Sequence, residues 1–252
     1  MVLLEGLHAI EVALSVRIGY VLGKRDPLAH LDPNLLDPVS CAESKVVRSA
    51  SQERTEITAH EMWLARYEKL KHDAREEEYV KHHILHYGGN VPIWVATEFM
   101  DFGCLIRLLK LMLPSDQKKI AEEMGLSRDN KGQTLYRWLV ALNILRNHCS
   151  HSNRVWNRST VEQPPSFSTH VVELRLHHLN GIENSRRQKL YYLASLIAYL
   201  VVEVNPTTNW PRTFKTQAKK LGNVGGMTLE NTMGFPDDWD ALALWNYQPI
   251  AL

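Results

Sequence analysis

Residues 135–145 read LYRWLVALNIL, and residues 146–157, which follow directly, read RNHCSHSNRVWN. Apolar side chains in the first segment recur at the spacing of one helical face: Leu135, Trp138, Leu139, Leu142 and Leu145. Such a face is buried against the rest of a protein, so we expect a helix from about Gly132 to Ser150. The second segment gathers two arginines, two histidines, three asparagines and two serines at the polar end of that helix.

Most other periodic segments of the chain also have helical spacing. Further helices are expected over residues 7–18, 56–71, 76–86, 92–111, 115–125, 187–204 and 210–221. Proline-containing stretches at residues 26–40 and 157–169 predict loops. The β-prone residues 171–176 are not paired with a hairpin turn. We therefore predict an all-α fold.

The composition is that of a globular protein. The chain has 252 residues, of which 44% are hydrophobic and 23% charged. Its net charge of +1 means that a nucleic-acid partner would have to be met by a local basic patch. Three widely spaced cysteines favour a reducing cytoplasm, and the apolar run 190–202 is shorter than the roughly 20 residues of a membrane span. We expect a cytoplasmic protein without a membrane segment.

The chemistry of residues 146–157 suits a phosphodiester. An arginine binds an anionic phosphate, and a histidine can move a proton near neutral pH. Arg146 and His151 are the candidates, because they follow a buried helical face that would hold them rigidly. Residues five apart diverge by about 140° on a helix, so the long arginine side chain or fraying after His148 must close the gap. Alternatively, both residues merely cap the helix carboxyl end, where cations are favoured.

Similar spacing elsewhere carries less weight. Four other pairs fit an arginine followed by four to six residues and a histidine, but they lie in a loop or in highly charged helices: Arg25–His30, Arg54–His60, Arg66–His72 and Arg75–His82.

His148, Cys149 and His151 could suggest zinc, yet no second cysteine and histidine cluster accompanies them, so no metal site is predicted. No glycine-rich phosphate loop or serine nucleophile elbow is present, and no cofactor is expected.

The motif run from Arg146 to Arg158 resembles the Abi-like family, bacterial abortive-infection proteins of the AbiD/AbiF type within the HEPN superfamily of helical ribonucleases. Further blocks that look like this family occur at residues 9–18, 92–103 and 233–245. The resemblance implies one Abi-like domain over residues 1–252, with a HEPN-like helical bundle over about 92–222. Additional N-terminal helices would occupy residues 1–88, and an irregular tail would end the chain.

The resemblance also implies a function: metal-independent RNA cleavage in antiphage defence, with toxin-like action. It places Arg146 and His151 at the reacting phosphate, with Asn147 as a polar helper, and implies a 2′,3′-cyclic phosphate and a 5′-hydroxyl as products. Surrounding polar residues would contact the RNA: Ser150, Asn153, Arg154, Asn157 and Arg158. More remote phosphate contacts could come from Lys118, Lys119, Arg186, Arg187, Lys189, Arg212, Lys215, Lys219 and Lys220.

Related nucleases pair two such motifs, so the resemblance implies a homodimer packed across its motif helices. Two alternatives stay open. The chain could be a non-catalytic RNA-binding protein that holds a small non-coding RNA, or an interaction scaffold whose motif forms a polar dimer contact.

Overall fold

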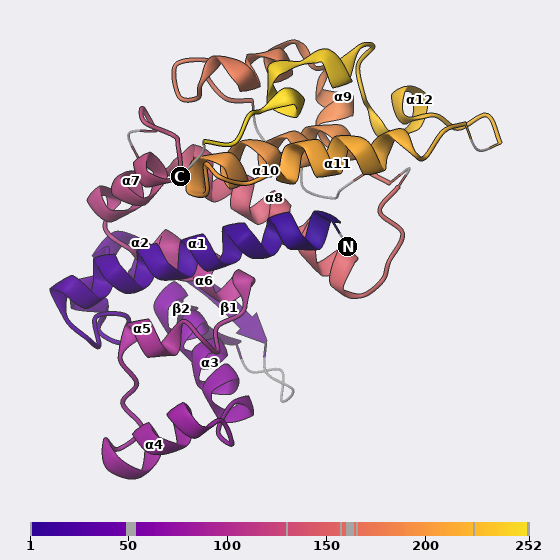
Figure 1. The fold of residues 1–252 in the computed structure, drawn as a ribbon. Coiled ribbons are helices and arrows are strands. Elements are labelled where there is room, and N and C mark those ends of the chain that lie inside the picture. Colours follow the sequence, from indigo (N-terminus) through magenta and orange to yellow (C-terminus); the bar gives the residue numbers. More distant parts are fainter. Residues whose placement is uncertain are drawn as a thin grey trace. The chain divides into compact units, whose positions relative to one another are not determined.

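The computed structural model describes residues 2–48, 54–129, 131–156, 158–159, 164, 166–223 and 225–250, with only the backbone described at residues 47, 48 and 54. Helices dominate it, which confirms the predicted all-α class (Figure 1). The chain divides into two compact units, one formed by residues 13–120 and the other by residues 1–12 together with 121–252. Helix α1 (Val2–Arg25) contributes to both. The predicted limits of a core over residues 92–222 and N-terminal helices over 1–88 remain predictions.

The unit formed by residues 13–120 is built around helices α3 (Ala59–Asp73) and α6 (Phe102–Leu111). Its other elements are η1 (Pro33–Leu35), α2 (Pro38–Ala42), β1 (Ser44–Arg48), β2 (Arg54–Thr58), α4 (Glu78–His86), α5 (Ile93–Ala96) and most of α7 (Pro114–Glu123). The Trp63 and Tyr67 rings of α3 are buried and stack 5.4 Å apart. Trp63 donates its indole N–H to the carbonyl of Cys104 on α6 at 3.1 Å, which ties the two helices together.

The strands β1 and β2 were not predicted. They pair antiparallel, from Ser44 opposite Thr58 to Arg48 opposite Arg54. The helix expected from residue 56 therefore starts only at Ala59. A capping box sets this start, since the Thr58 hydroxyl accepts the Glu61 N–H while the Glu61 carboxylate accepts the Thr58 N–H.

The helix expected over residues 92–111 is broken into α5 and α6. The Asp101 carboxylate accepts the backbone N–H of Cys104 at 2.7 Å, so Asp101 caps a new helix rather than continuing the earlier one. Local capping here overrides an apolar periodicity that runs through the break.

The other unit surrounds helix α10 (Leu190–Val204), whose residues from Tyr191 to Val202 are all buried. Around it lie α8 (Gln133–Ser150), η2 (Leu174–Gly181), α9 (Asn184–Arg187), α11 (Trp210–Lys219), α12 (Leu229–Met233), η3 (Trp239–Ala241) and η4 (Ala243–Asn246). The start of α1 also belongs here, because Trp210 donates its indole N–H to the carbonyl of Val2 at 2.8 Å. The helix expected over residues 187–204 is interrupted at Lys189, whose backbone is extended.

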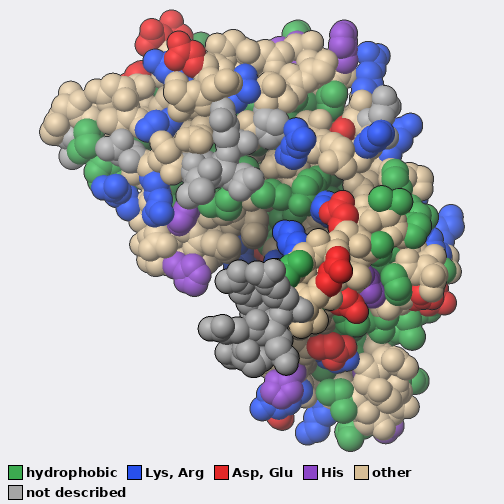
Figure 2. All heavy atoms as spheres, turned by 180° about the vertical axis from the view of Figure 1, so that it is seen from behind, with side chains coloured by type: hydrophobic (Ala, Val, Ile, Leu, Met, Phe, Trp, Pro, Cys, Tyr) green, Lys and Arg blue, Asp and Glu red, His purple; other side chains and the backbone are tan. Residues whose placement is uncertain are grey.

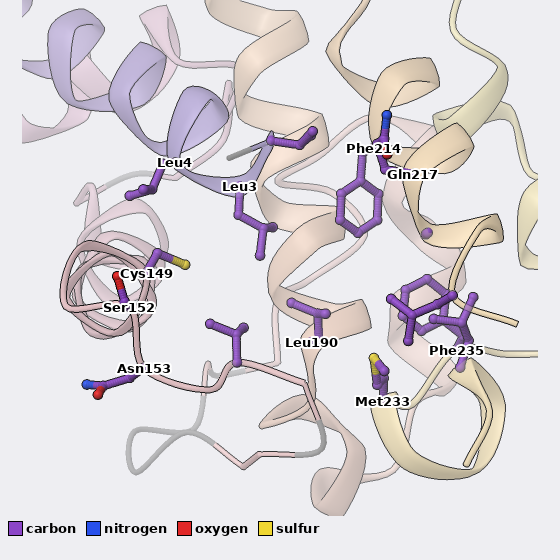
Figure 3. A pocket seen from close by; sticks show the side chains of 15 residues that line it. Leu3, Leu4, Cys149, Ser152, Asn153, Leu190, Phe214, Gln217, Met233 and Phe235 are labelled. Atoms are coloured by element: carbon purple, nitrogen blue, oxygen red, sulfur yellow. The ribbon is translucent and has the colours of Figure 1, made fainter. Parts of the chain in front are cut away.

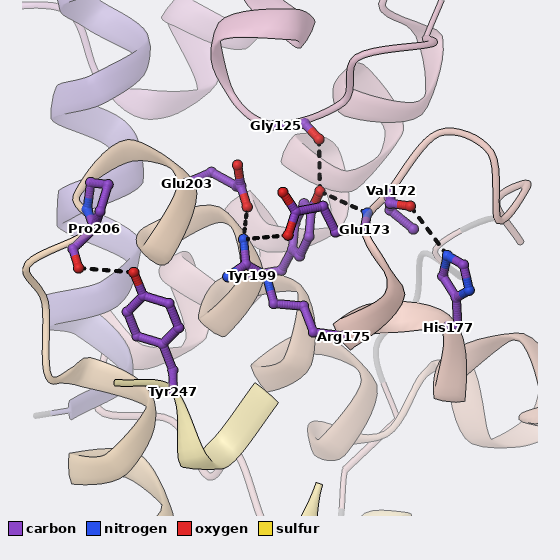
Figure 4. Close-up of polar contacts among 9 residues, drawn as sticks. All are labelled: Gly125, Val172, Glu173, Arg175, His177, Tyr199, Glu203, Pro206 and Tyr247. Atoms are coloured by element: carbon purple, nitrogen blue, oxygen red, sulfur yellow. Dashed lines mark hydrogen bonds and ion pairs between the residues drawn. The ribbon is translucent and has the colours of Figure 1, made fainter. Parts of the chain in front are cut away.

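A polar cluster fastens η2 to α10 (Figure 4). Arg175 forms ion pairs with Glu203 and Glu173, and the Tyr199 hydroxyl donates to the carbonyl of Gly125 at 2.7 Å. The same hydroxyl accepts the N–H of Glu173 at 3.2 Å. The β-prone residues 171–176 therefore run into η2 instead of a strand. Along the described part of the chain, no helix combines the length and the apolar character that a membrane crossing requires.

Candidate functional site

The helix that carries the motif is α8, as predicted. Its apolar face is buried through Leu135, Trp138, Leu139, Ala141, Leu142 and Leu145. The Asp129 carboxylate accepts the N–H of Leu135 at 3.0 Å and so anchors the beginning of the helix. Because α8 packs against the buried helix α10, its carboxyl end is presented from a rigid support.

That carboxyl end closes in an ordered turn rather than fraying. Ser152 donates its N–H to the carbonyl of Cys149 at 3.2 Å, and Asn153 donates to the carbonyl of His148 at 2.9 Å. Ser152 has φ of +54°, so the pair of bonds forms a Schellman motif with a serine in the left-handed position where glycine is usual. Fraying after His148 therefore does not bring Arg146 and His151 together. His151 is the C-cap residue of α8 and lies within this turn.

The structure gives Arg146 a specific neighbour. Its Nη2 atom lies 3.7 Å from Oε1 of Glu11 on α1, and the side chains of Arg146 and Glu11 are 32% and 16% exposed. A guanidinium has five N–H donors, so one carboxylate leaves donors available for a phosphate. Glu11 was not among the predicted site residues, and its distance along the sequence left no local signal for this contact.

His151 and Asn147 are exposed on the same helix end. Ser150 is exposed as well, but its hydroxyl donates to the carbonyl of Arg146 at 2.9 Å and so serves the helix itself. In the part of the chain that the structure describes, no hydrogen bond or ion pair joins Arg146 to His151. The guanidinium and the imidazole therefore project from the same helix end in different directions, as the divergence of about 140° between residues five apart on a helix implies.

The residues after the turn are also solvent-exposed. Asn153, Arg154 and Arg158 are exposed, and the Arg154 guanidinium lies over the ring of Trp156 at 5.4 Å. Burial lowers the pKa of His148, and the charges of Arg158 and His151 lower it further. His148 and Arg158 line one small pocket together with Leu145 and Val155. Asn157, the remaining predicted RNA contact, lies outside the described residues.

The other side of the turn faces an apolar cavity of about 670 Å³ (Figure 3). Its walls come from the start of α1, the motif turn, α11 and α12, through residues that include Leu3, Cys149, Val155, Phe214 and Met233. The Cys149 sulfur points toward the cavity, whereas the Asn153 amide points away from it. Burial raises the pKa of the Cys149 thiol. The turn thus separates an apolar side from a polar, exposed side.

His148, Cys149 and His151 do not form part of a metal-ligand cluster. Within the described ranges, no three histidine, cysteine, aspartate or glutamate side chains come together as a metal site would require.

Two of the lysines that were predicted to contact phosphate form polar contacts within the protein instead. Lys215 donates to the carbonyl of Asp240 at 2.7 Å and to the Asn246 side chain at 2.7 Å, and Lys219 pairs with the Asp240 carboxylate at 2.6 Å. These lysines hold the C-terminal tail against α11. On the face drawn in Figure 2, the described Lys and Arg side chains are interspersed with acidic and neutral ones.

A family model described as Abi-like protein matches residues 1–157. No curated protein and no solved structure matches the chain. The matched range contains both Glu11 and the motif as far as Asn157.

Proposed function

The chain belongs to the Abi-like family, and on that premise we propose that it is a metal-independent endoribonuclease of abortive-infection defence. Arg146 binds the scissile phosphate, His151 transfers a proton, and Asn147 assists them. The family suggests the defence role; the ribonuclease chemistry, the HEPN relationship and the toxin-like action are part of the proposal.

One observation supports this chemistry most strongly: the Arg146 and His151 side chains project from the same helix end, and they differ in how firmly they are held and in how exposed they are. Arg146 is half-buried and held beside Glu11. His151 is exposed on a turn that is held by backbone hydrogen bonds from Ser152 and Asn153. A phosphate clamp benefits from a fixed direction, whereas an acid–base group needs access to the reacting oxygen.

The reaction needs no group beyond RNA and the protein. The 2′-hydroxyl loses its proton to a base, the 2′-oxygen attacks the phosphorus, and the bond from phosphorus to the 5′-oxygen breaks. The departing 5′-oxygen takes a proton from an acid. The products are a 2′,3′-cyclic phosphate and a 5′-hydroxyl, and Arg146 stabilises the charge that develops on the non-bridging oxygens.

One imidazole cannot act as base and acid at the same moment. We therefore include a homodimer in the proposal, in which a second copy of the motif supplies the other proton-transfer group. In such a dimer, Arg146 and His151 need not touch within one protomer. Asn153, Arg154 and Arg158 would then lie along the path of the RNA.

A second function is favoured by the separation of Arg146 from His151. An RNA-binding protein that holds a small non-coding RNA would need exposed cationic and polar groups, but no contact between guanidinium and imidazole. Arg146, Arg154 and Arg158 would serve it as phosphate contacts.

Sequencing the RNA that copurifies with the protein separates these functions. For a nuclease, we expect wild-type protein to yield RNA with new internal 5′-hydroxyl ends, and His151→Ala to yield the same RNA uncut. An RNA-holding protein would yield identical uncut RNA from both, lost when Arg146 and Arg154 are replaced. Arg75→Ala and His82→Ala are matched controls, since they alter an exposed pair with similar spacing outside the motif. Absence of RNA from every preparation would contradict both functions.

A further inference from the structure

Trp156 is an exposed aromatic residue within the motif run. Its side chain is 41% exposed and that of Trp94 is 50% exposed, whereas the other tryptophans lie in a core: Trp63, Trp138, Trp210, Trp239 and Trp245 are at most 4% exposed. An exposed indole offers a large aromatic face and a polar N–H to a ligand, and what distinguishes Trp156 from Trp94 is the arginine beside it.

The Arg154 guanidinium covers part of this indole, with its central carbon 5.4 Å from the ring centre. Arg154 stays exposed, and the exposed fraction of Trp156 is what remains with the guanidinium in place. Charge and aromatic surface therefore occur together, a combination that suits a flat, electron-rich ligand carrying a phosphate.

The side chains of this segment differ in their exposure. Residues 153–155 lie outside any helix or turn, and Arg154 and Trp156 are both exposed. Val155, between the two, lines the apolar cavity of Figure 3 together with Leu190 and is only partly exposed. Val155 thus anchors the segment on the inside, and the Schellman turn at Ser152 fixes where it leaves α8.

We propose that Arg154 and Trp156 form a stacking platform for one nucleobase of single-stranded RNA. This proposal rests on the proposed function, because the base belongs to the RNA whose phosphate Arg146 binds. An aromatic platform accepts any base, because every base has a π face, so it contributes affinity and register rather than sequence choice. Arg154 adds attraction for the neighbouring phosphate.

The platform predicts a defined loss of RNA affinity. Affinity is measured by fluorescence anisotropy with a labelled uridine dodecamer, in a His151→Ala background that prevents cutting. Trp156→Ala should weaken binding about 5- to 150-fold, equivalent to the about 1–3 kcal/mol of one base–aromatic stack. Trp156→Phe keeps a ring and should restore most of the affinity. In a series of dodecamers that each lack the base at a different position, affinity for the parent protein should fall most when the missing base is the one that stacks on Trp156. Trp156→Ala should remove this dependence of affinity on the abasic position.

Tyr20 and Lys119 offer a matched control, because the Lys119 ammonium also lies 5.4 Å from the exposed Tyr20 ring. Tyr20→Ala should leave RNA affinity unchanged. If Trp156→Ala, folded to the same helical content, binds as tightly as its parent, the platform is refuted while RNA binding and cleavage stand. If the parent binds no RNA and wild-type protein cuts none, the proposed function fails and the platform with it.

Discussion

Replacing Glu11 with glutamine removes the charge beside Arg146 and keeps the shape of the side chain. With 3.7 Å between Oε1 and Nη2, the Coulomb attraction is about 1 kcal/mol in the dielectric of water and about 4 kcal/mol at an effective dielectric of about 20. Both side chains keep some exposure, and measured pairs of this kind contribute about 0.2–1 kcal/mol net. We expect a loss in the upper part of that net range, because Glu11 is only 16% exposed.

Glu11 has other contacts, so the single substitution alone would mix several effects. A double-mutant cycle with Arg146→Ala, followed by urea unfolding, isolates the pair. The coupling energy should be about 0.2–1 kcal/mol and should shrink as salt rises from about 0.1 M to about 1 M. In RNA cleavage, Glu11→Gln should slow the reaction about 2- to 5-fold, since about 1 kcal/mol of lost orientation raises the barrier. Additive effects in the cycle, or faster cleavage by Glu11→Gln, would refute a positioning role for Glu11.

Further predictions concern the stability of each unit. Burial lowers the pKa of His30 to about 3, so below about pH 6.5 the unfolded chain binds a proton that the folded chain does not. Stability should therefore fall as the pH drops from 6.5 toward 3, by up to about 1.4 kcal/mol per pH unit, and His30→Phe should flatten this dependence in urea titrations at several pH values. Ser152→Gly should raise stability by about 1 kcal/mol, because glycine adopts the left-handed turn without the steric cost of a side chain; an unchanged or lower melting temperature would contradict this. Arg25 donates two hydrogen bonds to the buried Asp116 carboxylate, at 2.9 and 2.7 Å, so Arg25→Ala should cost about 3–5 kcal/mol in chemical denaturation, and a loss below about 1 kcal/mol would show that water replaces the pair.

The sequence was most informative where a pattern repeats over several turns. The apolar face from Leu135 to Leu145 predicts α8 because burial of that face dominates its energetics. The pattern was least informative where one side chain decides the outcome. Asp101 starts α6 inside a continuing apolar pattern, and Thr58 with Glu61 starts α3 three residues after the expected position. The capping-box spacing of Thr58 and Glu61 is a signal that could have located that start.

The site was only partly predictable for a different reason. A motif lists residues that are close in the chain, and it places Arg146, Asn147 and His151 on one helix end. It cannot supply a partner such as Glu11, which reaches Arg146 from another helix through tertiary packing. Nor can spacing show that the Ser150 hydroxyl donates a hydrogen bond to the Arg146 carbonyl, or that Val155 lines a cavity while Trp156 is exposed.

The chemistry of the cut ends tests the central claim most directly. Purified protein is incubated with a structured RNA in excess EDTA, and the product ends are identified by mass spectrometry for wild type, Arg146→Ala and His151→Ala. We expect wild type to produce 2′,3′-cyclic phosphate and 5′-hydroxyl ends, and both variants, folded as judged by circular dichroism, to produce none. Cleavage that persists in both variants, or ends that carry a 3′-hydroxyl and a 5′-phosphate, would contradict attack by the 2′-hydroxyl at Arg146 and His151.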